Sequence, residues 1–248
     1  WCKSQQNMQI ICDQWTEDAF CATRGLLYND PLYGLADAHL SKDADFGAYY
    51  AAMKEKIAAV LSGIVSLGPL CLPWTDELRQ WQSRVLLMRR MEGEGSEWPD
   101  VSDEALLASL REEGADCWLA RWLNGITRRA QFSRIELDKA LHSLLPYASA
   151  RRLEREAPTH LAVPSGSEVR IDYLPEGGPV LAVKLQEMFG QQESPTVCNG
   201  KCAVTVHLLS PAGRPLQVTR DLAGFWRTGY AAVRAEMRGR YPKHPWPE

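Results

Sequence analysis

The sequence predicts an α+β fold, in which a helical N-terminal half precedes a small, mostly antiparallel strand-rich module closed by a C-terminal helix. Up to Pro158, apolar residues recur every three or four positions, as they do on one face of a helix. After Pro158 apolar and polar residues alternate, and a last amphipathic stretch follows Asp221. These observations divide the chain into a helical domain, residues 45–157, and a strand-rich domain, residues 158–248. Residues 1–44 show no sustained period and form an irregular segment of unknown role.

The first predicted helices begin and end at local signals. Asp45 can cap a helix that ends at Gly68-Pro69. A second predicted helix starts at Thr75 and stops at Gly93, and a third begins at Ser102. The expected apolar positions are Phe46, Tyr49, Tyr50, Met53, Ile57, Val60, Leu61 and Ile64 in the first helix, and Leu78, Trp81, Val85 and Met88 in the second.

Two more helices are predicted before the change of period. Ser133 and Glu136 have the spacing of a capping box, in which the hydroxyl satisfies a backbone N–H of the first turn and the carboxylate reaches back. The helix that they start would run into Pro146 with leucines on one side, and a short helix would follow over residues 147–157.

Strand signals follow in the second half. Residues 169–173 alternate apolar and polar side chains, as a half-buried strand does. The stretch "GGPVLAVKL" predicts another strand whose continuation "QEMFG" could turn helical, and "RPLQVTRD" predicts a further one. Asn199-Gly200 lies between two β-prone runs, which is a strong hairpin signal. Asp221 is expected to cap the terminal helix.

Charge is unevenly distributed along the chain. Its net charge is −3, yet residues 151–248 carry 13 Lys and Arg against 10 Asp and Glu. Residues 205–243 are more basic still, with seven basic against two acidic side chains. A basic C-terminal surface suits contact with an anion such as a nucleic-acid backbone, and it is equally compatible with a solvated surface.

The composition bears on the cellular location of the chain and on whether it binds a metal. Seven cysteines in a chain of 248 residues favour reduced thiols and a cytoplasmic location over a disulfide scaffold. No apolar run is long enough to span a bilayer, so no membrane contact is expected. No targeting segment is visible, and a chain that starts with Trp1 is interpreted as a fragment or a processed form. Cys198 and Cys202 lack the spacing of a zinc ribbon, so no metal site is predicted.

The stretch "PSGSEVRIDY", residues 164–173, decides whether a catalytic loop is present. A phosphate loop of the Walker type needs Gly-x4-Gly-Lys-Ser/Thr, and a nucleophile elbow needs Gly-x-Ser-x-Gly. Neither pattern occurs here, and a strand follows. The stretch is therefore interpreted as a turn that enters a strand, and no catalytic residue is predicted. The hydroxyls of Ser165 and Ser167 could still touch a phosphate.

The terminal helix carries the clearest binding signal. At 100° per residue, Arg227, Arg234 and Arg238 fall within about 40° of one another, next to a sector of aromatic and aliphatic residues. A ridge of three guanidiniums suits phosphate oxygens, because the planar group donates two hydrogen bonds at once. The alternative is a ridge that pairs with the acidic helical half of the same chain.

Four segments carry a resemblance to a known family. They closely resemble the C-terminal region of the HrpB family, bacterial ATP-dependent RNA helicases of the DEAH/RHA group. The segments are "LPWTDELRQWQSRVLLMRR" (72–90), "APTHLAVPSGSEVRIDY" (157–173), "VLAVKLQEMFGQQESPTV" (180–197) and "HLLSPAGRPLQVTRDLAGFWRTGYAAVRAEMRGRYPKHPWPE" (207–248).

The resemblance implies an accessory region that lies beside a helicase motor. In this family ATP and Mg serve two RecA-like domains, whose motifs this sequence lacks, so the chain should bind neither cofactor and should be inactive alone. It would contribute contacts to single-stranded RNA or DNA and pack against motor domains in cis or against a protein partner. The candidate nucleic-acid contacts are Ser165, Ser167, Arg170, Arg214, Arg220, Arg227, Arg234, Arg238 and Arg240.

A second hypothesis is a protein-interaction or structural module that has lost its motor. Nine tryptophans motivate it, and aromatic side chains exposed at the surface would favour it.

Overall fold

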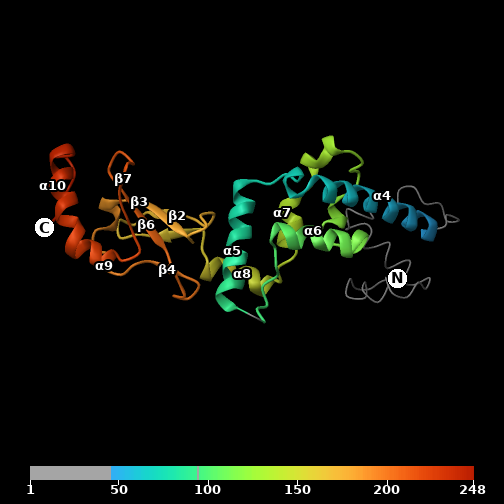
Figure 1. Ribbon diagram of the computed structural model, residues 1–248, viewed down its shortest axis with the longest axis horizontal. Coiled ribbons are helices and arrows are strands. Elements are labelled where there is room, and N and C mark those ends of the chain that lie inside the picture. The colour runs from blue at the N-terminus through green and yellow to red at the C-terminus, as the bar shows by residue number, and fades with distance from the viewer. Residues whose placement is uncertain (1–45, 94) are drawn as a thin grey trace. The chain divides into compact units, whose positions relative to one another are not determined.

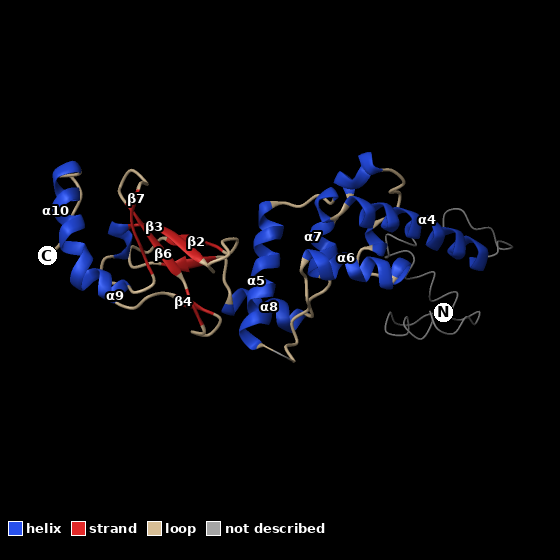
Figure 2. Ribbon diagram, in the orientation of Figure 1, coloured by secondary structure: helices blue, strands red, loops and turns tan. Residues whose placement is uncertain are grey.

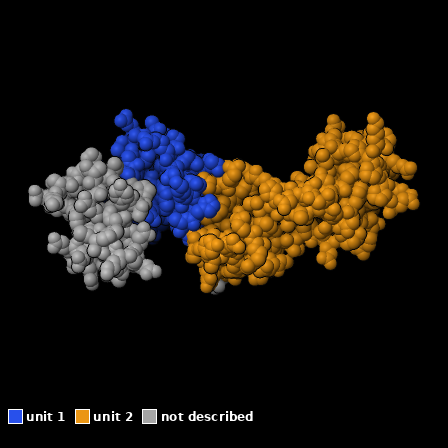
Figure 3. All heavy atoms as spheres, turned by 180° about the vertical axis from the view of Figure 1, so that it is seen from behind, with its two compact units in different colours: residues 1–75, 101–144 blue, residues 76–100, 145–248 orange. Residues whose placement is uncertain are grey.

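The computed structural model describes residues 46–93 and 95–248 (Figure 1). The chain forms two compact units, whose described residues are 46–75 and 101–144 in the first and 76–93, 95–100 and 145–248 in the second (Figure 3). The predicted cap at Asp45 and the irregular segment 1–44 lie outside the described residues. The domains predicted from the sequence, residues 45–157 and 158–248, stay a prediction.

The first unit is built from helices. The predicted first helix is α4 (Phe46–Leu67), which buries Ile57, Leu61 and Ile64. The Ser102 hydroxyl accepts a hydrogen bond from the Ala105 N–H at 3.2 Å and so caps the next helix, as predicted. The remaining helical elements of this unit are η2 (Pro69–Cys71), α6 (Asp103–Glu112), η3 (Gly114–Asp116), η4 (Ala120–Trp122), η5 (Arg129–Arg134) and α7 (Leu137–His142).

The predicted capping box at Ser133 and Glu136 is wrong. Ser133 lies inside the 3-10 helix η5, and α7 starts at Leu137 with no side-chain cap from Glu136. The Glu136 carboxylate instead pairs with Lys139, one turn further on. The backbone N–H groups at the start of η5 are satisfied by the Gln131 side chain, which accepts from Thr127 at 2.8 Å. The helix ends at His142, so it is shorter than predicted.

Two helices of the second unit precede its sheet. They are α5 (Asp76–Glu92) and α8 (Tyr147–Glu156). The predicted apolar face of α5 is confirmed, because Leu78, Trp81, Val85 and Met88 are buried. The same helix also buries the polar residues Gln80, Gln82 and Arg84. The Gln80 amide joins α5 to the strands, since it donates to Asp172 at 2.7 Å and accepts from the Tyr173 N–H at 2.8 Å.

A five-stranded sheet follows, with the order β1-β2-β3-β6-β7 (Figure 2). Only the β3–β6 pair is parallel, so the prediction of a mostly antiparallel module is confirmed. Strands lie within each of the predicted stretches 169–173, "GGPVLAVKL" and "RPLQVTRD", with bounds that differ by one or more residues, and β1 was not predicted. The strands are β1 (His160–Ala162), β2 (Glu168–Asp172), β3 (Val180–Lys184), β6 (Thr205–Leu209) and β7 (Pro215–Thr219).

Two short insertions leave the sheet after β3. The 3-10 helix η6 (Leu185–Met188) continues β3, as the helical alternative predicted. Asn199 and Gly200 form the predicted hairpin turn, between β4 (Thr196–Val197) and β5 (Cys202–Ala203). This hairpin is a separate two-stranded sheet, because neither β4 nor β5 pairs with a strand of the five-stranded sheet.

The terminal helix is not a regular α-helix. It starts as α9 (Leu222–Gly224), passes through a π-helical turn, η7 (Phe225–Gly229), and continues as α10 (Tyr230–Arg240). The Asp221 carboxylate accepts from the Gly224 N–H at 2.8 Å, which confirms the predicted cap. A Cβ on Gly224 would lie 2.1 Å from that carboxylate, so the capped turn requires a glycine here. Among the described helices none is long and apolar enough to cross a membrane.

Candidate nucleic-acid interface

The candidate contact residues all fall in the second unit, on three structural elements (Figure 1). Ser165 and Ser167 lie in the β1–β2 turn, and Arg170 lies on β2. The β6–β7 turn and the end of β7 carry Arg214 and Arg220. The terminal helix carries Arg227, Arg234, Arg238 and Arg240.

The Pro-Ser-Gly-Ser stretch is the β1–β2 hairpin turn, so its interpretation as a turn entering a strand is confirmed. Its three backbone donors are already used within the unit. The Ser165 N–H donates to Glu187 O at 3.2 Å, the Gly166 N–H to Val163 O at 2.8 Å and the Ser167 N–H to Ser165 Oγ at 3.3 Å. The turn therefore offers a phosphate no free backbone N–H. The Ser165 hydroxyl donates to Ser167 Oγ at 3.1 Å, so the Ser167 hydroxyl is the donor of this turn that is still available.

Arg170 and Arg220 hold parts of the second unit together. Arg170 Nη2 lies 2.6 Å from Asp76 Oδ2, which ties β2 to the start of α5. Arg220 Nε donates to Thr205 Oγ1 at 2.8 Å, and its Nη2 donates to the carbonyl of Gly177. These contacts tie the end of β7 to β6 and to the β2–β3 loop. Both guanidiniums would have to release a partner before they could bind a phosphate.

Two arginines of the terminal helix are also paired. Arg234 Nη2 lies 2.8 Å from Glu248 Oε1, and Arg240 Nη1 lies 3.4 Å from Glu236 Oε1, one turn away. Within the described residues of the second unit, no arginine of this helix pairs with α5 or α8. The assumption of a regular helix is wrong across Phe225–Gly229, because the π-turn changes the angle per residue between Arg227 and the two later arginines.

Three of the candidate arginines have no partner among the described residues. The guanidiniums of Arg214, Arg227 and Arg238 make no ion pair or hydrogen bond with any residue that the structure describes. A guanidinium keeps its charge at all physiological pH values and donates in a planar, two-pronged geometry that matches phosphate. These three side chains are therefore the ones ready to bind an anion.

An aromatic cluster anchors the helix that carries two of them. The Trp226 ring packs against Phe189, Phe225 and Tyr230, with centroids 6.0, 5.0 and 5.2 Å away. The Trp226 Nε1–H also donates to the Gln191 carbonyl at 2.6 Å. The predicted division of the helix into an aromatic packing side and a basic side is thus present, and the packing fixes the backbone from which Arg227 projects.

The sequence interpretation missed two basic side chains on the sheet. In β3 and β6, Val183 and Val206 are buried while Lys184 and His207 alternate with them on the opposite, more exposed face. The register places Ala182 beside His207 and His207 beside Val218, which is 52% exposed. The period-2 alternation of both strands was the signal that could have identified this face.

One thiol of this unit has a strongly shifted pKa. Burial and, second, the neighbouring Cys202 raise the pKa of the Cys198 thiol to about 12, so it stays protonated and is a poor nucleophile. Across the described part of the chain, no three His, Cys, Asp or Glu side chains gather as metal ligands would.

A family model described as "ATP-dependent helicase C-terminal" matches residues 118–248. The chain is similar to the ATP-dependent RNA helicase HrpB of Escherichia coli strain K12, with 42% identity over 190 residues. The similar stretch covers 77% of this chain and 23% of that protein.

Two crystal structures are also similar. One is the E. coli DExH-box NTPase HrpB, with a TM-score of 0.69 and 42% identity over 75% of this chain and 22% of that one. The other is the E. coli DEAH/RHA helicase HrpB, with a TM-score of 0.61 and 40% identity. The similar part covers 75% of this chain and 23% of that chain. The chain therefore spans less than a quarter of the length of these relatives.

Proposed function

Because the chain belongs to the ATP-dependent helicase C-terminal family, we propose that it is the accessory C-terminal region of an HrpB-like RNA helicase. In this proposal it binds single-stranded RNA or DNA through Arg214, Arg227 and Arg238. The hydroxyls of Ser165 and Ser167 and the side chains of Lys184 and His207 are additional candidate contacts.

One observation carries the proposal. Seven arginines are candidates, and four of them are paired within the unit while three keep unpaired guanidiniums on its surface. A surface that binds phosphates needs cations whose charge is not already neutralised. Phosphate contacts of this kind position a strand and do not distinguish its sequence, which suits an accessory region of a helicase.

The remaining activities of such a helicase are assigned to other domains. The sequence contains neither Gly-x4-Gly-Lys-Thr nor Asp-Glu-x-His, so ATP and Mg would bind to motor domains outside this chain. Packing against those domains, in cis or as a partner, is the second part of the proposal.

The test is binding of a labelled 15-nucleotide poly-U RNA to the chain at 50 and 200 mM salt, followed by fluorescence anisotropy. Three contacts to a single strand predict a slope of log K against log salt of about −2, so affinity should fall by about 20-fold over this range. The double variant Arg227→Glu, Arg238→Glu should abolish most of the binding. Arg111→Glu with Arg151→Glu makes the same charge change at exposed sites outside the predicted interface and should bind nearly as well as the parent. Equal losses in the two double variants, or binding that ignores salt, would exclude the proposed contacts.

The protein-interaction hypothesis is not favoured by the tryptophans. Of those that the structure describes, Trp81 and Trp98 are buried and the others are half-buried, so none presents a fully exposed ring.

A further inference from the structure

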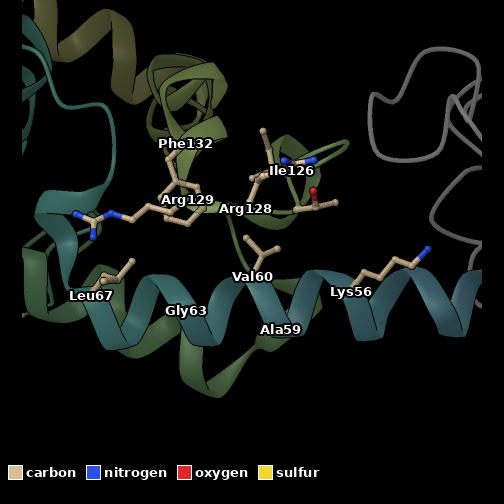
Figure 4. A pocket seen from close by; sticks show the side chains of 10 residues that line it. Lys56, Ala59, Val60, Gly63, Leu67, Ile126, Arg128, Arg129 and Phe132 are labelled. Carbon is tan, nitrogen blue, oxygen red and sulfur yellow. The ribbon is translucent and has the colours of Figure 1, made fainter.

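The first unit contains an open groove that the proposed function does not use. It lies between α4 and residues 126–132 and has a volume of about 350 Å³ (Figure 4). Its apolar lining comes from Val60 and Leu67 of α4 and from Ile126 and Phe132 on the facing segment. Figure 4 shows these side chains lying between the helix and the segment opposite. A groove of this volume can accept two or three aliphatic side chains.

The charged residues that line the groove are all basic. They are Lys56, Arg128 and Arg129, and none of the groove's lining residues is acidic. All three are exposed, and their charged groups make no ion pair or hydrogen bond with any residue in the described parts of the chain. Elsewhere on α4, Lys54 pairs with Asp116 at 2.8 Å, so a nearby carboxylate is used where one exists. The groove therefore presents an apolar floor beside three cations that no described residue neutralises.

Gly63 keeps the groove open. It lies inside α4, where a glycine is less favourable than an alanine because its backbone loses more conformational freedom on folding. A Cβ at this position would meet no atom within 4 Å, so no neighbour in the fold requires the missing side chain. Gly63 lines the groove, and a larger residue there would project into it. The absence of a side chain at Gly63 therefore leaves this part of the space between α4 and the facing segment unfilled.

The apolar surface continues beyond the groove. Leu67, at its end, is 46% exposed, and Leu70, in the following 3-10 helix, is 82% exposed. Large apolar side chains that gather at the surface of a unit mark a site of association.

We propose that this groove binds an acidic, amphipathic helix of a partner protein. Apolar side chains spaced at i, i+3, i+4 and i+7 would enter the groove, and carboxylates on either side would pair with the three cations. The distance from Lys56 to Leu67 along α4 is about 16 Å, which corresponds to about three turns of such a helix. A nucleic-acid strand fits less well, because Phe132, the aromatic residue of the lining, is only 6% exposed and offers no free face for a base. The inference is independent of the proposed function, which concerns the second unit.

The experiment uses the whole chain and a synthetic helix as the probe. A labelled 18-residue peptide of Leu and Glu, with Leu at i, i+3, i+4 and i+7, is titrated with the protein and followed by anisotropy. A peptide of the same composition with scrambled order and a peptide with Lys in place of Glu serve as ligand controls. Saturable binding of the amphipathic acidic peptide, at least tenfold tighter than either control, is expected.

Two variants locate the binding site. Gly63→Leu fills the groove without a clash and should weaken binding at least tenfold while the thermal unfolding midpoint stays the same or rises. Gly239→Leu is the matched control, since Gly239 also lies in a helix with no atom within 4 Å of its Cβ, and it should bind like the parent. Arg128→Glu with Arg129→Glu should lower the affinity for the acidic peptide and raise the affinity for the peptide with Lys in place of Glu.

Several results would overturn the proposal. They are the absence of binding, equal binding of the scrambled peptide, and parent-like binding by Gly63→Leu. Displacement of the peptide by poly-U RNA, together with loss of RNA binding in Gly63→Leu and not in Arg227→Glu with Arg238→Glu, would assign the groove to nucleic acid instead.

Discussion

The arginines at the α5–α8 packing and those on the terminal helix have opposite surroundings. Arg84 is 3% exposed, and its guanidinium donates to the Ala157 carbonyl at 2.6 Å and to Glu154 at 2.8 Å. Arg152 bonds Glu156 at 2.9 Å. Arg227 and Arg238 are exposed and have no partner among the residues described.

This difference shows what decides the role of an arginine here. Around α8, carbonyls and carboxylates lie within hydrogen-bonding distance of Arg84 and Arg152. The guanidinium charges are therefore neutralised in contacts that hold helices together. On the terminal helix, Glu236 and Glu248 neutralise Arg240 and Arg234 and leave the other two unpaired. Binding capacity therefore follows from missing partners and not from the number of arginines.

The largest effect is expected from Arg84→Met. The loss of the guanidinium would leave the buried Ala157 carbonyl, at the end of α8, without the donor that Arg84 supplies, and we expect the free energy of unfolding to fall by about 3 kcal/mol. Urea unfolding followed by circular dichroism measures this change. Arg90→Met is the control, because Arg90 lies at an exposed position of α5, the helix that also carries Arg84. It should change the free energy of unfolding by less than about 0.5 kcal/mol. Equal effects of the two variants would show that the contacts of Arg84 do not matter.

A smaller and pH-dependent effect is expected from Glu156→Gln. Glu156 is 5% exposed, and the hydrogen bond from Arg152 lowers the pKa of its carboxyl below the usual 4.5 although burial opposes this. Because the pKa is lower in the folded state, the stabilisation is present above about pH 4.5 and is lost as the pH falls below it. The variant should be less stable than the parent by about 2 kcal/mol at pH 7.

Urea midpoints at pH 7 and pH 4 check the sign of this effect. The difference between Glu156→Gln and the parent should narrow at the lower pH, because only the parent loses an ionised carboxylate. A constant difference would mean that packing, and not charge, explains the loss at pH 7.

Arg220→Gln should cost about 1 kcal/mol of stability, the typical value for lost hydrogen bonds at a partly exposed site. Its guanidinium joins Thr205 and Gly177, and glutamine is too short to reach both. RNA affinity should change little, in contrast to its change in the terminal-helix variants. A large loss of RNA affinity with unchanged stability would place Arg220 among the binding residues.

The smallest stability effect is expected from Arg227→Gln with Arg238→Gln. Unpaired exposed side chains contribute little, so the free energy of unfolding should change by less than about 0.5 kcal/mol. The slope of log K against log salt for poly-U RNA should nevertheless become shallower by about 1.4, the value for two lost contacts to a single strand. A clear loss of stability would indicate that these guanidiniums have structural partners after all.

The sequence was most informative where periodicity alone decides the structure. The apolar face of α5, the alternation in β2 and the caps at Ser102 and Asp221 are all local features, and the structure confirms each. The capping box at Ser133 failed because its spacing is also compatible with a 3-10 turn, whose donors Gln131 satisfies.

Features that depend on tertiary partners could not be predicted. Arg84 and Gln80 are polar residues within a helix and would ordinarily be assigned to its exposed side; they are buried because their partners come about 70 and 90 residues later in the chain. The parallel pairing of β3 with β6 and the Arg234–Glu248 ion pair depend on the fold in the same way. In the candidate interface, the sequence predicted the residue types and the structure separated the paired arginines from the unpaired ones.

The alternation of the two units along the chain has a consequence for its synthesis. The segment 76–100 emerges from the ribosome before residues 101–144, yet it packs with residues 145–248. The apolar face of α5 therefore stays exposed to solvent while residues 101–144, which belong to the other unit, are synthesised. A ribosome-stalled chain that ends at residue 144 would expose Trp81 and Val85 to chaperones, and completion of α8 would end that exposure.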